Sequence, residues 1–205
     1  MNKNIESIWD DPDYCNMLEG VLERDVFGYK FIERFGGWAN LPDMTIVDAG
    51  CGFGRMAALF SKANYRGFDS SEKLVWHCKE RGLAVERANI YRLPVVSFSA
   101  DLVIAHAVLL HIGYPEDALK ELWRITKHRL IFSCFYRRWG LVHRGPTATW
   151  TEDKTAGRGW WMAHNYVPLW MWSRMIGRLP QLIKVQRIRY TGCEPIFYYV
   201  LDRDE

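Results

Sequence analysis

Residues 46–60, IVDAGCGFGRMAALF, decide which fold this chain is expected to adopt. A short apolar run leads into a glycine-rich turn and then into a segment with the composition of a helix. A dinucleotide-binding loop has its glycines in the pattern G-x-G-x-x-G between a strand and a helix. Here the glycines from Gly50 to Gly54 are spaced G-x-G-x-G. Arg55 stands where the third glycine of that pattern belongs, and Asp48 lies just ahead of the loop. The stretch predicts a strand, a ligand-binding loop and a helix, and its departure from the pattern is the main clue to the ligand.

Length and composition bound the class of protein. The 205 residues suit one domain with a continuous core. No apolar run approaches the ~18 residues of a membrane helix, and the N-terminal stretch MNKNIESIWDDPDYC lacks the apolar part of a signal peptide. We therefore expect a soluble, cytoplasmic protein with no membrane partner. The five cysteines are scattered and form no C-x-x-C pair, which predicts free thiols and no metal site.

The charge is distributed unevenly along the chain. Residues 137–190 contain ten Lys or Arg and two acids, a net charge of +8, whereas the rest has seventeen and twenty-two, a net charge of −5. Basic residues among aromatic ones can bind an anionic or planar ligand, or nucleic acid. They can equally form a solvated basic face over a core that contains tryptophan. Six of the ten tryptophans lie in this region: Trp139, Trp150, Trp160, Trp161, Trp170 and Trp172.

Strand-like and helix-like segments alternate through the first two thirds of the chain. Such alternation implies right-handed crossovers and a parallel sheet with helices on both faces. Pro115 at the first turn of one helix and Ser70 or Ser71 before another are typical helix starts. Strands are expected at 44–50, 64–69, 83–90, 100–108 and 128–136, and helices at 15–36, 53–63, 70–82, 115–126 and 164–180.

The C-terminal part follows a different pattern. Two β-like runs, 181–191 and 194–203, are separated only by Gly192 and Cys193. So short a connection cannot contain a parallel crossover, so the two runs are expected to form an antiparallel hairpin. The expected fold is a doubly wound α/β domain that ends in a hairpin.

Two acids flank the predicted ligand site. In a doubly wound sheet, ligands bind beyond the carboxyl ends of the strands, where Gly50 and Gly52 let the backbone approach closely. Asp69 ends the second predicted strand, 21 residues after Asp48, where a carboxylate can accept both hydroxyls of a ribose. Asp48 would repel a pyrophosphate but attract an ammonium or sulfonium group. A nucleoside joined to a cationic amino acid describes S-adenosylmethionine better than a nicotinamide dinucleotide.

With these residues in place, four segments resemble the class I S-adenosylmethionine-dependent methyltransferases of the small-molecule group often called type 11. With their connections they span residues 44–136, under half of the chain. The resemblance implies a Rossmann-like sheet of seven strands in the order 3-2-1-4-5-7-6, with strand 7 antiparallel. The segments are VDAGCGFG (47–54), YRGFDSS (65–71), ANIYRLPVVSFSADLVIAHAVLLHI (88–112) and HRLIFSCF (128–135). The expected organisation is one domain, 1–205, with an N-terminal helical cap (1–40), a cofactor-binding core (41–136), a substrate-side segment and helix (137–180) and a C-terminal β-hairpin (181–205).

The resemblance also implies which residues hold the cofactor. Asp48 and the backbone from Gly50 through Cys51 to Gly52 would hold the methionine portion, and Asp69 the ribose. For the two acids, the alternative is an ordinary loop acid and turn acid.

Three more residues would lie near the adenine. Ser70 would flank the ring, or cap the following helix instead. Asn89 and Ile90 follow the third predicted strand, at positions that usually touch adenine in the family. Aspartate is commoner than asparagine there, and an amide carbonyl is a weaker acceptor than a carboxylate.

The end of the fourth predicted strand would face the methyl group. By position, Ala105 would contact the cofactor through its backbone, and His106 and His111 would orient the substrate or take its proton. The alternative is that both histidines only pack behind the site. The transfer itself is an in-line displacement that needs alignment rather than a metal.

The sequence says least about the molecule that accepts the methyl group. Residues 105–108 read AHAV where family branches acting on amides or on DNA often have N/D-P-P-Y/F, which argues against those substrates. The substrate pocket is expected to be walled by Tyr14, Trp161, His164 and Tyr166, each of which could instead be a packed lid residue without polar contact.

Three functions follow as alternatives. The first is a methyltransferase for a small molecule that is anionic or aromatic, and the second is an RNA (tRNA) methyltransferase, suggested by the basic region. The third is a protein that binds S-adenosylmethionine without catalysis. A nicotinamide oxidoreductase would have to account for Asp48 and Arg55. The sequence predicts neither the acceptor atom nor the oligomeric state.

Overall fold

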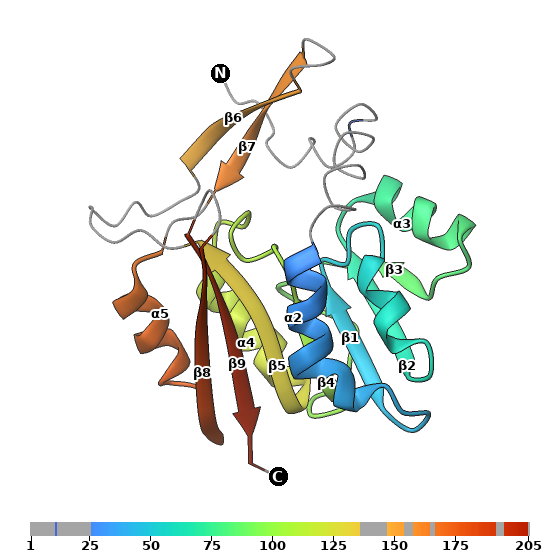
Figure 1. Cartoon of the computed structure of the whole chain (residues 1–205), viewed down its shortest axis with the longest axis vertical. Coiled ribbons are helices and arrows are strands. Elements are labelled where there is room, and N and C mark those ends of the chain that lie inside the picture. Colours follow the sequence, from blue (N-terminus) through green and yellow to red (C-terminus); the bar gives the residue numbers. More distant parts are fainter. Residues whose placement is uncertain are drawn as a thin grey trace.

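A seven-stranded mixed sheet forms the centre of the molecule (Figure 1). The computed structural model describes residues 11, 26–135, 147–153, 158–164, 167–191 and 195–204. The sheet order is β3-β2-β1-β4-β5-β9-β8; the first five pair in parallel, and β9 runs antiparallel to both of its neighbours. The expected order 3-2-1-4-5-7-6, with a reversed strand 7, is therefore confirmed. The strands are β1 (Thr45–Ala49), β2 (Asn64–Asp69), β3 (Val85–Arg87), β4 (Ala100–Ala105), β5 (Thr126–Phe135), β8 (Leu182–Thr191) and β9 (Pro195–Arg203).

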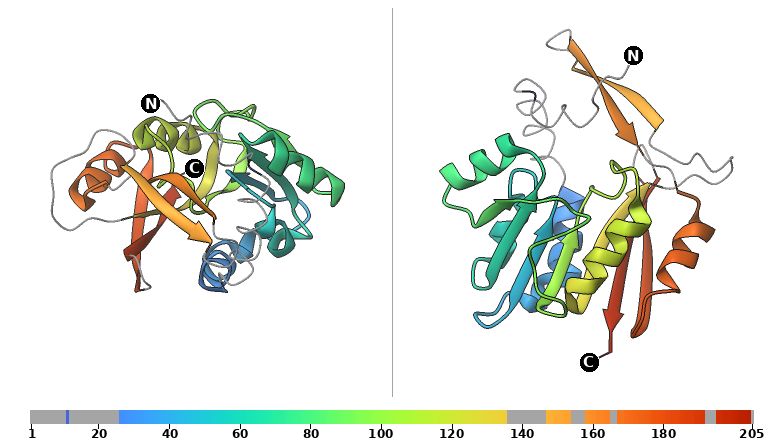
Figure 2. Two further views of the ribbon diagram at one scale, coloured as in Figure 1. Left: turned by 90° about the horizontal axis from the view of Figure 1, so that it is seen from above. Right: turned by 180° about the vertical axis from the view of Figure 1, so that it is seen from behind.

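Helices cover both faces of the sheet (Figure 2). On one face, α4 and α5 bury Trp123 and Trp172 in a core with alternate residues of β1, β4, β5 and β9. On the other face, α2 and η3 bury Phe31 and Phe60 against the intervening residues of the same strands. The helices are α2 (Val26–Gly36), η2 (Gly37–Ala39), η3 (Arg55–Phe60), α3 (Glu72–Glu80), α4 (Pro115–Ile125) and α5 (Leu169–Ile176).

Local signals explain where several helices begin and end. The hydroxyl oxygen of Ser71 accepts from the Leu74 N–H at the start of α3 (3.1 Å), so Ser71 rather than Ser70 is the cap. Gly82 follows this helix with a positive φ of 75°. The helix α4 has Pro115 in its first turn, as expected.

Two expected helices differ from those observed. Residues 53–63 contain the six-residue 3₁₀ helix η3, because left-handed Gly54 precedes it and the Ala57 N–H bonds three residues back to the Gly54 carbonyl. The helix expected at 164–180 is limited to α5, which begins directly after Pro168, a residue that disfavours helical backbone before itself.

The segment between β5 and α5 contains a hairpin that the sequence did not predict. Strands β6 (Thr147–Asp153) and β7 (Arg158–His164) pair antiparallel as a separate two-stranded sheet. In Figure 1 this hairpin projects past the ends of β5 and β9. Its Thr- and Trp-rich sequence has β propensity, which was the signal available for it.

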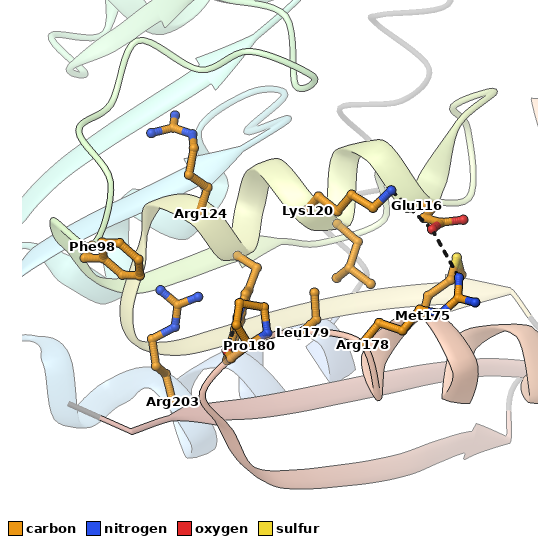
Figure 3. Close-up of a pocket in the computed structure, with 11 residues that line it drawn as sticks. Phe98, Glu116, Lys120, Arg124, Met175, Arg178, Leu179, Pro180 and Arg203 are labelled. Carbon is orange, nitrogen blue, oxygen red and sulfur yellow. Dashed lines mark hydrogen bonds and ion pairs between the residues drawn. The ribbon is translucent and has the colours of Figure 1, made fainter.

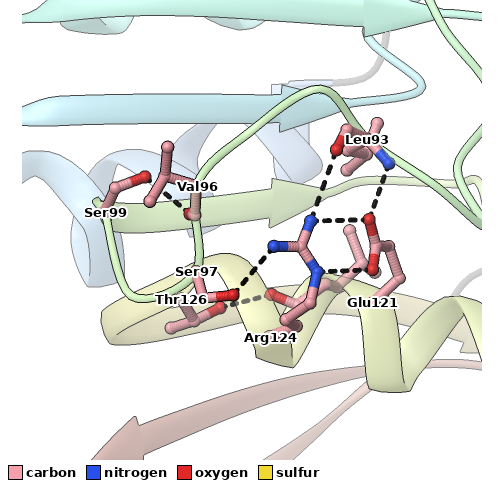
Figure 4. A network of polar contacts seen from close by, with 8 residues as sticks. Leu93, Val96, Ser97, Ser99, Glu121, Arg124 and Thr126 are labelled. Carbon is pink, nitrogen blue, oxygen red and sulfur yellow. Dashed lines mark hydrogen bonds and ion pairs between the residues drawn. The ribbon is translucent and has the colours of Figure 1, made fainter.

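The connection between β3 and β4 is tied to α4 by a network of polar contacts (Figure 4). Glu121 accepts from the Leu93 N–H (2.6 Å), and Arg124 donates to Glu121, to the Leu93 carbonyl and to Ser97. Burial alone would raise the pKa of Glu121, but the hydrogen bonds from Arg124 and Leu93 outweigh it and keep that pKa below its usual value. The network fixes the connection that carries Asn89.

Across the part of the chain that the structure describes, no helix is long and apolar enough to span a membrane.

Candidate functional site

The loop after β1 has a backbone that only glycine adopts readily. Gly50, Gly52 and Gly54 have φ angles of 74°, 54° and 69°, in the left-handed region. The N–H groups of Gly50 and Cys51 both donate to the carbonyl of Phe68 in β2, at 2.6 and 3.0 Å. The loop is therefore folded back onto the end of the neighbouring strand.

Gly50 and Gly52 have different surroundings. A Cβ on Gly50 would lie 2.4 Å from a Val108 methyl group, so the absence of a side chain lets the loop after β4 pack here. Among the residues that the structure describes, a Cβ on Gly52 would meet nothing within 4 Å. Gly52 therefore borders space that no described residue fills, with backbone that a ligand can approach.

Asp69 holds this loop in place. Its two carboxylate oxygens accept from the N–H groups of Gly52 and Ser71, both at 2.9 Å. The Gly52 N–H, which a phosphate would need, is thus already donated to a carboxylate. Each oxygen of a carboxylate has a second lone pair, so Asp69 can still accept from other donors.

Asp48 lies in β1, just before the loop, and has a raised pKa. It is 2% exposed and accepts from the Tyr65 hydroxyl at 2.8 Å. Burial, and to a smaller extent the charge of Asp69, raises its pKa to about 7, against the opposing effects of Tyr65 and Arg55. We expected this carboxylate to face the ligand, but in the structure it is buried beneath the loop, with one oxygen bonded to Tyr65.

Two thiols support the loop from below. Cys51 and Cys78 are buried, and the Gly52 carbonyl accepts from the Cys78 thiol at 3.2 Å. The interaction between the two thiols raises the pKa of Cys51 and lowers that of Cys78. Cys78 was not a candidate from sequence, since it lies on α3, far along the chain from the loop. The free-thiol prediction holds for the described cysteines, Cys51, Cys78 and Cys134.

The residues expected near adenine lie at the ends of β2 and β3. Ser70 is exposed, and its carbonyl accepts from Arg87 (3.1 Å). Asn89 is also exposed, and its side-chain oxygen accepts from the Tyr91 N–H (3.0 Å) in a local turn. Ile90 is half-buried and packs against the core.

The carboxyl end of β4 becomes accessible at His106. Ala105 is fully buried, so the expected backbone contact has no exposed surface there, and the accessible chain starts one residue later. Ala107 has a left-handed φ of 56°, which is unusual for a residue with a Cβ. Its N–H donates to the hydroxyl of buried Ser133 in β5 (2.8 Å), which holds this turn in place.

His106 contacts Tyr198, a residue that the sequence analysis did not identify. Its Nδ1 lies 3.3 Å from the Tyr198 hydroxyl, and the two rings stack with an angle of 14° between their planes. Tyr198 is buried in β9 and stacks in turn on Phe31 of α2. Only the sheet register brings His106 and Tyr198 together, because they are 92 residues apart in the chain.

The structure describes most of the other candidate site residues only in part or not at all. His111 is half-buried in a turn where its N–H donates to the Val108 carbonyl (2.8 Å). Trp161 and His164 belong to β7, opposite Trp150 and Thr147, but their side chains lie outside the described part. Tyr14 and Tyr166 lie outside the described residues altogether. No group of three metal-binding side chains occurs among the residues that are described.

A groove of about 390 Å³ lies elsewhere, between α4 and the connection from α5 to β8 (Figure 3). Its apolar floor contains Trp123, and Arg203 stacks on that ring and on Phe98, at 4.3 and 4.5 Å. Arg203 also donates to the carbonyl of Thr126 just past the C-terminus of α4. This is a stabilising arrangement for a cation at the negative end of a helix, and the groove is separate from the glycine loop.

Known sequences match the part of the chain that contains the glycine loop. Residues 47–133 match the family described as "Methyltransferase domain". An uncharacterized protein of Methanocaldococcus jannaschii is 32% identical over 124 residues, which cover 58% of this chain and 52% of that protein. A tRNA (carboxymethyluridine(34)-5-O)-methyltransferase of Arabidopsis thaliana is 31% identical over 105 residues, 46% of this chain and 26% of that protein. This chain therefore aligns with about half of one relative and a quarter of the other.

Solved structures share the fold over most of the chain. A geranyl diphosphate C-methyltransferase from Streptomyces coelicolor A3(2) superposes with a TM-score of 0.67 over 95% of this chain and 87% of its own, at 15% identity. A SAM-dependent methyltransferase from Methanosarcina mazei gives 0.65 over 85% and 97%, also at 15% identity. Residues 47–133 therefore match a methyltransferase domain family, and the chain shares its fold with solved S-adenosylmethionine-dependent methyltransferases.

Proposed function

We propose that this chain transfers a methyl group from S-adenosylmethionine to a small molecule with an anionic or aromatic group. The observation that carries the choice of cofactor is the bond between the Gly52 N–H and Asp69. A dinucleotide pyrophosphate needs free N–H groups at this loop, and here a carboxylate occupies one of them. The loop therefore disfavours a phosphate and accommodates an uncharged or cationic group.

The residues of the loop fit the proposed cofactor. Asp48 is a buried carboxylate whose raised pKa reflects the lack of sufficient compensating charge, and a nearby sulfonium or ammonium would supply that charge. The open space at Gly52 leaves room for the methionine portion beside the backbone. Asp69 would take the ribose hydroxyls with its remaining lone pairs, and Asn89 and Ile90 would border the adenine.

The chemistry divides between the cofactor and the chain. When bound, S-adenosylmethionine supplies an electrophilic methyl group, and alignment with an acceptor atom contributes about 7–11 kcal/mol. The loop would hold the donor through Gly50, Cys51 and Gly52, while His106 and His111 would position the acceptor at the end of β4. Trp161 and His164 of β7 would help to wall the acceptor pocket.

Calorimetric titration with three ligands tests the proposed cofactor. S-adenosylmethionine and S-adenosylhomocysteine are expected to bind, and NAD is expected to give no heat of binding. Binding of NAD without a response to the other two would overturn the proposal. Binding of both sulfur ligands with no methyl transfer to any acceptor would indicate an accessory protein instead.

A second candidate acceptor is tRNA. The Arabidopsis thaliana relative is named for that substrate, and the exposed side chains of Lys184, Arg187 and Arg189 on β8 add positive charge in the described part of the basic region. These observations permit RNA as the acceptor but do not favour it over a small molecule.

Salt dependence separates the two acceptors. If tRNA is the substrate, filter binding of total tRNA is expected to weaken at least about tenfold from ~50 to ~200 mM salt. The double variant Lys184→Gln, Arg189→Gln is then expected to reduce the salt slope by about two. Lys120→Gln, an exposed change on α4, is the matched control. Absent or salt-independent binding would exclude the tRNA reading.

A further inference from the structure

The groove beside α4 contains a buried cation that has no carboxylate partner in the described part of the chain. Arg203 lines this groove and is 6% exposed. Of its three guanidinium nitrogens, only Nη1 makes a hydrogen bond to a described residue, the Thr126 carbonyl at 2.8 Å. Burial lowers the pKa of Arg203, and no nearby acid opposes that effect. The charge of Arg203 therefore lacks a counter-charge.

The other cations that line the groove each have an acidic partner. Arg124 is paired with Glu121 at 2.7 Å. Lys120 and Arg178 both contact Glu116, at 3.2 and 4.0 Å. Buried charges in proteins are normally paired, because an ion without a partner is costly to remove from water. The groove departs from this rule only at its most buried cation.

The groove joins this charge to an apolar surface. In Figure 3, Phe98 and Arg203 lie at one end of the groove, and Glu116 and Arg178 lie at the other. The apolar lining also includes Leu119, Trp123, Met175, Leu179 and Pro180. A ligand that complements both parts of the groove has an anionic head and an apolar body.

Two aromatic rings orient the guanidinium of Arg203. Its Cζ lies 4.3 Å from the centre of the Trp123 ring and 4.5 Å from that of Phe98. A guanidinium that stacks on rings still has its N–H groups for hydrogen bonds, and these match the two oxygens of a carboxylate. A carboxylate carries one negative charge, which one arginine balances. A phosphate monoester carries nearly two at neutral pH, and the second would be buried without a partner.

We propose that this groove is a ligand site for a small amphipathic monocarboxylate, with the carboxylate at Arg203 and the apolar body along Leu119, Met175 and Leu179. The groove volume of about 390 Å³ is typical of small-molecule sites. The site does not depend on the proposed methyl transfer, because the groove and the glycine loop share no residue.

Calorimetric titration of the full chain tests the head and the body of the ligand separately. The probe is octanoate; octanol has the same chain without the charge, and acetate has the same head without the chain. We expect octanoate to bind at least about tenfold more tightly than octanol. Acetate is expected to bind at least about a hundredfold more weakly than octanoate. Equal binding of octanoate and octanol, or no binding of octanoate, would overturn the proposal.

Two variants locate the carboxylate. Arg203→Gln removes the charge and is expected to weaken octanoate at least about tenfold, to the level of octanol. Lys127→Gln is the matched control, because Lys127 follows Thr126 and is paired with Asp101 at 3.1 Å, but does not line the groove. It is expected to change the affinity by less than about twofold. Equal losses in the two variants would mean that octanoate responds only to the overall charge.

A measurement on the wild-type chain makes the test independent of how Arg203→Gln folds. The indole Nε1 of Trp123 donates to the Pro180 carbonyl in the groove at 2.8 Å, so its ¹H–¹⁵N resonance reports on ligands there. Octanoate is expected to shift this resonance with the affinity found by calorimetry. Trp38 in η2 is 40% exposed and lies outside the groove, so its resonance is expected to stay in place. Trp123→Phe and Trp38→Phe assign the two signals. An unmoved Trp123 resonance, or an equal shift of both, would overturn the site.

Discussion

The two ends of the site are built on different principles. At the β1–β2 end, Asp48, Gly52 and Asp69 lie within one short stretch of sequence, and the loop is held by backbone hydrogen bonds and carboxylates. At the β4 end, His106 and Tyr198 are far apart in sequence, and the site depends on side chains in one row of the sheet. The cofactor end is thus encoded locally, whereas the acceptor end is encoded by strand register.

Gly50→Ala is expected to have the largest effect and to disrupt the loop. A methyl group at Gly50 would meet Val108 at 2.4 Å and impose a left-handed backbone on alanine. Overpacking and strain together are expected to lower the free energy of unfolding by about 2–5 kcal/mol, measured by urea denaturation.

Alanine at two other glycines separates the effect of backbone strain from the effect of the contact with Val108. Gly52→Ala adds only the backbone strain, about 1–2 kcal/mol, because the space beside it is open. Gly113 has neither a positive φ nor a close neighbour among the described residues, so Gly113→Ala is expected to change stability by less than about 0.5 kcal/mol. Equal effects at all three positions would contradict the role given to Val108.

Asp48→Asn tests the buried acid through pH. Because the pKa of Asp48 rises from 3.8 to about 7 on folding, the folded state binds more protons than the unfolded state between these values. Its contribution to stability therefore falls as the pH rises from about 4 to 7. Relative to the Asp48→Asn variant, the wild type is expected to lose about 2–3 kcal/mol of stability between pH 5 and pH 8.

The comparison is made by urea unfolding of both proteins at several pH values, so that all other titrating groups cancel. A difference between the two proteins that does not change with pH would contradict the raised pKa. Binding of a cationic ligand would reverse the shift, so its affinity is expected to increase as the pH rises through 7.

Asp69→Ala tests the proposed contact between Asp69 and the ribose of the cofactor. Loss of the ribose acceptor is expected to weaken binding of S-adenosylhomocysteine by about 1.5–3 kcal/mol in a calorimetric titration, the value of a hydrogen bond to a charged group. Ser71→Ala is the matched control, since it removes the cap of α3 at about 1 kcal/mol of stability while leaving Asp69 in place. Unchanged affinity in folded Asp69→Ala would remove the ribose role.

Tyr198→Phe is expected to have a small effect on stability. The hydrogen bond to His106 is long, at 3.3 Å, so its loss is expected to cost about 0.5–1.5 kcal/mol in urea denaturation. A larger loss would mean that the hydroxyl mainly supports the core rather than orienting the histidine.

The same contrast explains what the sequence could predict. The C-terminal hairpin and the glycine loop follow from local periodicity and from glycines whose positive φ few other residues tolerate, whereas the sheet order was implied by the family resemblance. The partner of His106 could not be predicted, because strand register depends on packing across the whole sheet. The burial of Asp48 was also missed, since a chain position beside a loop does not say which face of the strand the side chain takes.

The bond between Asp69 and the Gly52 N–H has a consequence for the rate of binding. Because the Asp69 carboxylate and the Phe68 carbonyl hold the loop on β2, little backbone entropy remains to be lost when a ligand binds. Such preorganisation places the cost of ordering the loop in the folding of the protein rather than in each encounter. Association is then governed by diffusion and by the charge of the approaching ligand, and release by the strength of the contacts that the ligand itself adds.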